Sequence, residues 1–536
     1  MTNKTIIHPQ YTQTAANYQL YLPMDVEEMI PLEDSVRLHC LLCERMDYRE
    51  LLQAYSRKGR KPAVDPVILF KVITYAASQK IYSSREIEKA CCRDINFRWL
   101  LQGYAAPDHS TISRFKQKYL TDTVMEKLFF QQIEWLYQQK AITGETIYID
   151  GTKIEAYANR YSFVWKKAIT KHEANMYLKW QALLEDINTT YCQIFTSTCE
   201  TFLVDLKKVL AFLEKLREEE QITFVYGKGK RKNVLQRYHE QVKEMLQRKE
   251  QYNASNQIMG EKRNSYSKTD HDATFMRMKD DHMRNGQLKP AYNIQAAVDA
   301  EFIVGIDAFS DRNDTTTLIP MLQYLKEHLP FTYRHIVADS GYESEENYVY
   351  LKNEKQTAYI KPQNHERKKK AAFKKDIKQR ENMGYDKSTD TYTCANNRQL
   401  HVLRSYTRAS QTGYESQVTV YECEDCSGCP LKEKCTKAKG NRQLHVAKAF
   451  LAYRETAQEN ILTETGTLYR MNRSIQVEGT FGVLKEDYHL KKFHTRGTSN
   501  VRNELLILAF GYNLNKIHTK IQADRLNLYY HPLKTA

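Results

Sequence analysis

The chain has 536 residues, more than one hydrophobic core normally holds, so we expect two to four domains. Lys and Arg outnumber Asp and Glu by 80 to 65, and the formal charge of +15 fits a polyanionic partner such as nucleic acid without requiring one. The N-terminus lacks the apolar core of a signal peptide, and the apolar stretch at residues 67–77 is interrupted by Lys71. These features predict a soluble, cytoplasmic protein and argue against a membrane protein.

The N-terminal region, residues 26–120, is predicted to be helical because apolar residues recur at spacings of three and four. Asp65 followed by Pro66 starts one helix with a capping residue and a proline at the first helical position. Ser83, with Glu86 three residues later, starts the next helix as a capping box. A helical domain therefore precedes the first predicted strand.

A short helix at residues 108–119 carries Ser110, Arg114 and Lys116, whose side chains could all face outward. It resembles the recognition element of a helix-turn-helix, in which early helix residues reach base edges and basic residues hold phosphates. An ordinary amphipathic helix with a solvated basic face is the alternative. One short helix does not decide between the two.

Strand and helix patterns alternate in the middle of the chain. Residues 146–150 form a short β-branched and aromatic run that ends in Asp150 and predicts a buried strand. Long helical patterns over residues 166–262 follow, which predict a helical hairpin inserted between strands. Strands are then expected at residues 291–298 and 302–308, joined as a hairpin.

Two more strands are expected, at residues 334–339, which end in Asp339, and at residues 357–360. A helix is predicted before them, at about residues 315–328, and another between them, at residues 344–353. The order strand, hairpin, helix, strand, helix, strand indicates an α/β fold with a mixed sheet, which places its chemistry at strand ends. This order is the one expected of a ribonuclease-H-like core.

Residues 363–450 form a separate segment, in which the apolar density drops and a cysteine cluster appears. Its charge run at residues 365–378 is either a solvated linker or a segment that contacts phosphates. Residues 397–402 recur as residues 441–446, which paired strands on either side of the cysteines would explain. Helical patterning then continues over residues 452–520.

Asp150 and Asp339 end short apolar strands, and the glycine close behind each would let the chain turn and nucleic acid approach. Glu478 is the third candidate, because on a helix it shares a face with Lys485. Cutting or joining a phosphodiester calls for two divalent ions, and oxygen ligands suit Mg²⁺ or Mn²⁺. The alternatives are turn-forming aspartates and a solvent-exposed Glu–Lys pair.

Three segments resemble, in the same order, the catalytic segments of the DDE transposases of bacterial insertion sequences: residues 148–153, 337–342 and 477–485. Further segments are similar to the branch called insertion sequence 1182: residues 158–167, 292–299 and 496–497. The resemblance implies a ribonuclease-H-like core with Mg²⁺ held by Asp150, Asp339 and Glu478. It also implies hydrolysis at the ends of the element and attack of the freed 3′-hydroxyl on target DNA.

By the same resemblance, Tyr469, Arg473 and Lys485 correspond to the Tyr, Arg and Lys that accompany the Glu in related enzymes and bind DNA. The strict signature has Arg four residues before the Glu, whereas Arg473 lies five before Glu478 and position 474 is Ser. On an α-helix the extra residue rotates the Arg side chain by roughly 100°. Glu478 and Lys485 therefore keep the spacing of the signature, whereas this offset leaves the role of Arg473 open.

Four cysteines fall within thirteen positions: Cys423, Cys426, Cys429 and Cys435. In a reducing cytoplasm such a cluster suggests a metal before a disulfide, and four thiolates can close a tetrahedral Zn²⁺ site. Three residues could replace one of these ligands: Cys394, His401 and His445. An iron–sulfur cluster and unmetallated thiols are the alternatives. Similar Cys segments accompany the resembled transposase branch, which favours a structural role.

The expected parts are a helical N-terminal DNA-binding domain (1–135), a ribonuclease-H-like core (136–165 and 285–362), a helical insertion (166–284), a basic Cys-rich insertion (363–450), C-terminal helices that carry Glu478 (451–520) and a tail (521–536). The expected enzyme cleaves and joins double-stranded DNA at transposon ends and target, as a homodimer in the synaptic complex. The alternatives are a catalytically silent, transposase-derived DNA-binding regulator and a stand-alone nuclease with the same metal chemistry.

Overall fold

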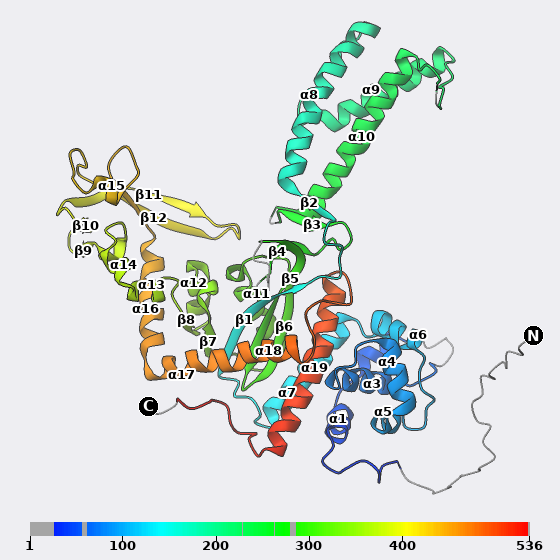
Figure 1. Cartoon of the computed structure of the whole chain (residues 1–536), viewed down its shortest axis with the longest axis vertical. Helices are drawn as coiled ribbons and strands as arrows, with labels where there is room; N and C mark the ends of the chain where they lie inside the picture. The colour runs from blue at the N-terminus through cyan, green and yellow to red at the C-terminus, as the bar shows by residue number, and fades with distance from the viewer. Residues whose placement is uncertain (1–25, 56–61, 228, 262, 279–285, 534–536) are drawn as a thin grey trace, which may run out of the picture.

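The computed structural model describes residues 26–55, 62–227, 229–261, 263–278 and 286–533 (Figure 1). The first part of the predicted N-terminal domain, residues 1–25, and the end of the predicted tail, residues 534–536, lie outside the described residues. Within the described ranges, no helix is both long and apolar enough to cross a membrane.

Six strands form the central sheet: β1 (Thr146–Glu155), β4 (Thr274–Arg277), β5 (Leu288–Asp299), β6 (Phe302–Phe309), β7 (His335–Ala338) and β8 (Thr357–Ile360). β1 lies between β7, to which it is parallel, and β5, to which it is antiparallel. β8 extends the parallel side, while β6 and β4 pair with different parts of β5. The predicted α/β fold with a mixed sheet is confirmed.

β1 is longer than predicted. Its antiparallel pairing with β5 continues to Glu155, which lies opposite Ala291. The parallel partner β7 ends earlier, and the last pair joins Ile149 to Ala338. Asp150 therefore lies inside the strand, at the point where the parallel pairing stops, and the prediction that it ends the strand is wrong.

The helices that pack around the sheet come from the middle and the end of the chain: α11 (Leu318–His328), α12 (Glu345–Asn353), α16 (Lys448–Leu462), α17 (Glu464–Arg473), α18 (Gly479–Glu486) and α19 (Thr498–Gln522). Two short 3₁₀ turns precede α11 and α12, Asp314–Thr316 and Ser340–Tyr342. A π-helical turn, Ser474–Glu478, joins α17 to α18. The predicted helical pattern over residues 452–520 is thus confirmed in type but divided into separate helices.

The N-terminal region is helical as predicted: α1 (Ser35–Glu44), α2 (Arg49–Gln53), α3 (Pro66–Ser78), α4 (Ser84–Arg93), α5 (Ile95–Leu100), α6 (His109–Arg114), a π-helical turn (Phe115–Tyr119) and α7 (Asp122–Gln138). Asp65 caps α3, since its Oδ1 accepts a hydrogen bond from Val67 N at 2.8 Å. Ser83 precedes α4, but its side chain makes no capping hydrogen bond, so the predicted capping box does not form. These helices share one continuous hydrophobic core with the sheet and α19.

Buried amides on α19 join the N-terminal helices to the sheet. Asn513 accepts a hydrogen bond from Ile303 N at 2.9 Å and donates one to Ile303 O at 2.8 Å, so it satisfies the backbone of β6 much as a neighbouring strand would. Gln132 of α7 donates to Phe510 O at 3.1 Å and accepts from Asn513. Because buried polar groups are costly when unpaired, this network fixes α19 between α7 and β6.

The helical insertion leaves the body at the end of β1. Two short antiparallel strands form its base, β2 (Phe163–Trp165) and β3 (Ser265–Ser267). Three helices project from this base: α8 (Lys166–Tyr191), α9 (Phe202–Glu219) and α10 (Val234–Met259) (Figure 1). They have their own apolar core, which includes Trp180, Leu206 and Val242. The predicted boundary at residue 284 is too late, because β4 already belongs to the central sheet.

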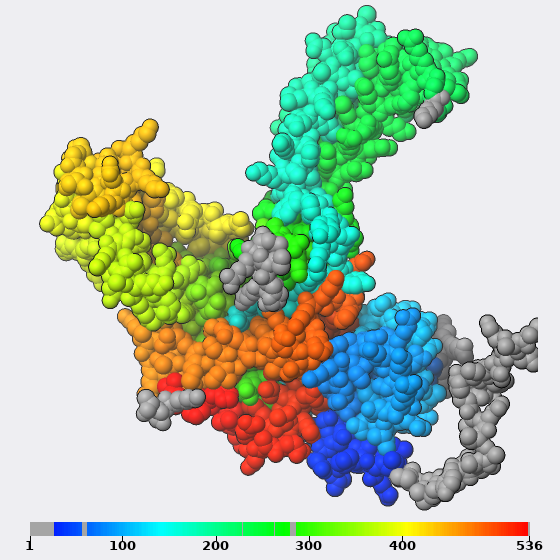
Figure 2. Space-filling view, in the orientation of Figure 1, coloured from blue at the N-terminus to red at the C-terminus, as the bar shows by residue number. Residues whose placement is uncertain are grey.

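The Cys-rich insertion forms a second sheet: β9 (Gly384–Asp386), β10 (Thr391–Thr393), β11 (Gln399–Ala409), β12 (Glu415–Cys423) and β13 (Gln443–Val446). Short helical segments accompany it: α13 (His365–Lys369), α14 (Ala371–Lys375), a 3₁₀ turn (Arg380–Asn382) and α15 (Lys432–Cys435). Both copies of the six-residue repeat contain strand, but each pairs with β12, not with the other. Figure 2 shows this sheet and the helical insertion as separate projections.

Gly511 marks a close contact between α19 and α3, because a Cβ there would lie 2.6 Å from Ser78 N and 2.8 Å from Ala77 C. We expect Gly511→Ala to force the two helices apart and destabilise the protein by about 1–3 kcal/mol, seen as a lower melting temperature. The matched control is Gly482→Ala, whose Cβ would meet no atom within 4 Å and whose helix propensity is higher. Equal melting temperatures for the two variants would contradict the close packing.

Candidate active site

Asp150 and Asp339 lie beside each other on neighbouring strands, because each directly follows the last residue pair of the parallel β1–β7 ladder. Asp150 Oδ1 accepts a hydrogen bond from Gly151 N at 2.9 Å, and Asp339 Oδ1 accepts one from Gly341 N at 2.7 Å. Asp150 is buried and Asp339 is half-buried. The sheet register thus brings together two carboxylates that are far apart in the sequence.

The glycines behind these aspartates are required by crowded side chains. A Cβ on Gly151, which lies within β1 and makes no turn, would meet Gln295 Nε2 first and would come 2.7 Å from Asp314 Oδ1. A Cβ on Gly341 would come 2.9 Å from Asp339 Oδ1 and 3.4 Å from Asp314 Oδ2. The predicted turn at Gly151 is therefore wrong. Asp314 has no periodic sequence signal, because it begins the short 3₁₀ turn Asp314–Thr316, and the paired glycines were the one sign of a crowded site.

Glu478 reaches the site from the π-helical turn. The inner side of this turn is anchored by Gln476, which is buried, accepts from Glu301 N at 3.1 Å and donates to Tyr529 O at 2.9 Å. A π-turn holds one residue more than an α-turn, so residues five apart align on one side. Arg473 therefore points to Glu478, with Nη2 2.6 Å from Oε1. The rotation that α-helical spacing would give Arg473 does not occur, because the π-turn absorbs the extra residue.

Arg473 also links Glu478 to the strand carboxylate, since its Nη1 lies 3.6 Å from Asp150 Oδ2. The guanidinium thus stands between two of the three predicted metal ligands and balances their charge. Carboxylate oxygens are the donor type that Mg²⁺ and Mn²⁺ prefer, so the residues fit such an ion chemically. Among the described residues, however, no group of three or more His, Cys, Asp or Glu side chains is arranged to hold a metal ion. In this arrangement Arg473 supplies the positive charge.

Tyr342 shows that the acidic groups converge. This fully buried side chain donates a hydrogen bond from its hydroxyl to Gln295 Oε1. Burial raises the pKa of Tyr342 well above its usual value, and the nearby carboxylates of Asp314, Asp150 and Asp339 raise it further. Three carboxylates from separate segments therefore lie near enough to this buried hydroxyl to act on its charge.

Tyr469 and Lys485, the other predicted companions of Glu478, differ in position. Tyr469 is buried, and its hydroxyl accepts a hydrogen bond from Thr146 Oγ1 at the start of β1. Its ring packs edge-on against Tyr359, with ring centroids 5.0 Å apart. The DNA-binding role predicted for Tyr469 does not fit this core position. Lys485 lies half-buried on α18, in the helical segment that follows Glu478.

The predicted DNA-binding helix places its residues on two sides. Ser110 and Arg114 of α6 are exposed and line a surface hollow of about 520 Å³. Lys116 is half-buried in the following π-turn, where its Nζ donates to Tyr82 O at 3.4 Å, and burial lowers the pKa of its ammonium group. The outward orientation predicted for Lys116 is therefore wrong, because the π-turn directs it into a neighbouring cavity of about 410 Å³.

The clustered cysteines line one small cavity of about 20 Å³: Cys423, Cys426, Cys429 and Cys435, together with Cys394. Burial raises the pKa of Cys423 to about 12. Cys423 Sγ donates to Asp425 O at 3.7 Å, and Cys426 Sγ accepts from Arg442 N at 3.4 Å. The predicted zinc site is not supported, because no metal-ligand set of three occurs in the part of the chain that the structure describes, and two of the thiols are hydrogen-bonded to the backbone.

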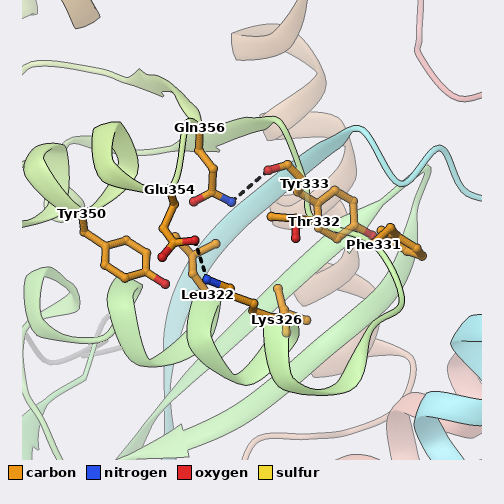
Figure 3. Close-up of a pocket in the computed structure, with 9 residues that line it drawn as sticks. Leu322, Lys326, Phe331, Thr332, Tyr333, Tyr350, Glu354 and Gln356 are labelled. Atoms are coloured by element: carbon orange, nitrogen blue, oxygen red, sulfur yellow. Dashed lines mark hydrogen bonds and ion pairs between the residues drawn. The ribbon is translucent and has the colours of Figure 1, made fainter.

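A pocket between α11, α12 and the loop before β7 is too small to be the active site (Figure 3). It measures about 10 Å³, and an ion pair between Lys326 Nζ and Glu354 Oε2, 2.6 Å apart, lies at its side. Gln356 Nε2 donates to Tyr333 O at 2.8 Å beside it. None of the residues that line it is one of the predicted catalytic carboxylates.

Two family models match the chain. One, described as Transposase DDE domain, matches residues 393–518 and includes Glu478 but neither Asp150 nor Asp339. The other, described as Transposase domain (DUF772), matches residues 24–118 in the N-terminal helices. Comparisons with curated proteins and with solved structures gave no match.

A DDE domain implies a ribonuclease-H-like core, a DNA substrate and the use of a divalent metal ion, generally Mg²⁺. With transposase domains at both ends of the chain and carboxylates gathered on the sheet between them, the protein is a transposase, an enzyme that cuts DNA and transfers its strands.

Proposed function

We propose that the enzyme binds the ends of its own insertion sequence and catalyses Mg²⁺-dependent cleavage and strand transfer, with Asp150, Asp339 and Glu478 as its catalytic carboxylates. The observation that carries this proposal is the ion-pair bridge from Asp150 through Arg473 to Glu478, 3.6 Å and 2.6 Å long, beside Asp339 on the next strand. The bridge links carboxylates from distant parts of the chain at one end of the β1–β7 ladder, and phosphodiester chemistry with two metal ions needs carboxylates that converge in this way.

In this proposal the three carboxylates hold Mg²⁺ or Mn²⁺, and the bound ions would activate the attacking oxygen and stabilise the leaving one. Binding requires Glu478 and Asp150 to release Arg473, because its guanidinium lies between them. Arg473 then turns its donors to a DNA phosphate, which suits the planar guanidinium fork. Lys485, on the helix after Glu478, adds a second phosphate contact.

The N-terminal helices are proposed to bind the transposon end through Ser110 and Arg114, which line one surface hollow. Glu88 of α4 fixes the start of α6, since its Oε2 accepts a hydrogen bond from His109 N at 3.2 Å. A short helix held against its neighbour in this way can present its exposed side to a groove.

The proposal also covers the branch of the family, the oligomeric state and the cell compartment. The chain is assigned to the insertion sequence 1182 branch by the segments that resemble it, and it acts on target DNA as a homodimer because two ends must be held together. The cell compartment is the cytoplasm. A catalytically silent regulator derived from a transposase is the second candidate function, and a stand-alone nuclease is the third.

Glu478→Gln should abolish Mg²⁺-dependent cleavage and strand transfer on a duplex that carries the ends of the parent element. We expect a loss of roughly a thousandfold or more, because metal binding supplies several kcal/mol of transition-state stabilisation. Binding of the same duplex should persist in the variant. Binding without cleavage in both the wild type and the variant would favour the regulator, and cleavage without strand transfer would favour the nuclease.

Arg473→Gln should lower strand transfer by about 10–100-fold, because a charge-assisted hydrogen bond to phosphate is worth about 1.5–3 kcal/mol. Arg473→Lys keeps the charge but loses the fork, so its activity should lie between those of the wild type and Arg473→Gln. Single-turnover kinetics on pre-cleaved DNA measure this order. Wild-type activity in Arg473→Gln would show that Arg473 is dispensable for the reaction.

Arg114→Ala should weaken binding of the transposon end and reduce the slope of log K against log[salt] by about one, as expected when one phosphate contact is lost. Lys116→Met is the matched control, because the Lys116 ammonium group already faces Tyr82 O and not the exposed side of α6. Fluorescence anisotropy at several salt concentrations gives both slopes. An equal reduction in the two variants would contradict the assigned surface.

A further inference from the structure

Asp314 lies against the proposed catalytic residues although the resemblance assigns it no role. It begins the 3₁₀ turn Asp314–Thr316, which precedes α11. Two side-chain amides of β5 hold its Oδ1: Asn293 Nδ2 donates at 2.8 Å and Gln295 Nε2 at 2.9 Å. Gln295 pairs across the sheet with Gly151, so the strand beside β1 fixes Asp314 next to the residue that follows Asp150.

The second oxygen of Asp314 faces Asp339. A Cβ on Gly341 would lie 3.4 Å from Asp314 Oδ2 and 2.9 Å from Asp339 Oδ1, so both oxygens border the same small space. The two turns are tied to each other, because Thr315 Oγ1 donates to Gly341 O at 2.9 Å. Asn347 Nδ2 donates to Thr315 O at 2.9 Å and to Tyr342 O at 2.7 Å, which locks both segments to α12. Among the described residues, Oδ2 accepts no hydrogen bond.

A carboxylate is unfavourable next to other carboxylates unless a cation balances it. Arg473 is a basic partner of both Asp150 and Glu478, and the amides on Asp314 Oδ1 are neutral. A divalent cation bound beside Asp339 would supply the missing charge and use the oxygen that faces it. Resting on the proposed function, we propose that Asp314 is a fourth carboxylate of the metal centre, which contributes Oδ2, directly or through a bound water, beside Asp339.

The test is Mn²⁺ binding to full-length protein without DNA, measured by calorimetry or electron paramagnetic resonance. Asp314→Asn keeps an Oδ1 that accepts from Asn293 and Gln295 but replaces Oδ2 with an amide donor. We expect it to weaken Mn²⁺ binding about 10–100-fold, as the loss of a ligand or of its hydrogen-bonded partner does. Asp311→Asn removes a charge from the same loop and should leave Mn²⁺ binding unchanged.

The melting temperature measured in the presence of a chelator separates a metal-binding role of Asp314 from a purely structural one. The two roles predict opposite shifts for Asp314→Asn. Removing one of several clustered carboxylates relieves repulsion, so metal-free Asp314→Asn should melt at or above the wild-type temperature, and Mn²⁺ should raise its melting temperature less than that of the wild type. A clear drop in the metal-free melting temperature would overturn the proposal and make Asp314 a structural residue.

Asp150→Asn separates this inference from the proposed function. If Asp150→Asn loses Mn²⁺ binding while Asp314→Asn binds like the wild type, the inference about Asp314 fails and the proposed function stands. If Mn²⁺ binds Asp150→Asn and the wild type alike, the proposed metal site fails, and the inference fails with it. Loss of binding in both variants, with Asp311→Asn unchanged, supports a metal centre of four carboxylates.

Discussion

The pairing of β1 with β7 on one side and with β5 on the other is the constraint on which the active site depends. Side chains alternate along a strand, so a slip of one residue would move Asp150 to the opposite face of the sheet. The parallel ladder stops just before Asp150 and Asp339, which leaves both carboxylates beyond the end of β7. The antiparallel ladder continues and places Gln295 opposite Gly151, where it holds Asp314. One register therefore positions all three acidic residues.

Glu478 depends on a different constraint, the π-turn between α17 and α18. Gln476 and Val477 are buried on the inner side of the turn, and Thr480 Oγ1 donates to Gln476 O at 2.7 Å. These contacts fix the helix after the extra residue, while Tyr469 in the core fixes the helix before it. The additional residue can be accommodated only by widening the turn, which keeps Arg473 and Glu478 on one side. π-turns of this kind occur often at functional sites.

Local sequence patterns correctly predicted the structural features that neighbouring residues determine. The capping of α3 by Asp65 and the apolar strands before Asp150 and Asp339 could be predicted because neighbouring residues determine them. The second half of β1 could not, since it exists through pairing with β5, which follows an inserted helical segment. The burial of Tyr469 and the inward turn of Lys116 also depend on distant partners, Thr146 and Tyr82. Asp314 lies in a loop, where periodicity gives no signal.

Arg473 couples the two halves of the proposed chemistry. In the structure its guanidinium is engaged by Asp150 and Glu478, and it is half-buried between them. In the proposed mechanism, a cation bound by those carboxylates would displace Arg473, and the displaced guanidinium would become available to a phosphate of the DNA. Either ligand would thus help to break the ion pairs of Arg473 with Asp150 and Glu478, which the other ligand must also break. Metal ion and DNA should therefore bind with positive cooperativity, and by linkage each should raise the affinity for the other by the same factor. Under the same proposal, the ion-pair bridge would balance the charge of Asp150 and Glu478 until both ligands are present.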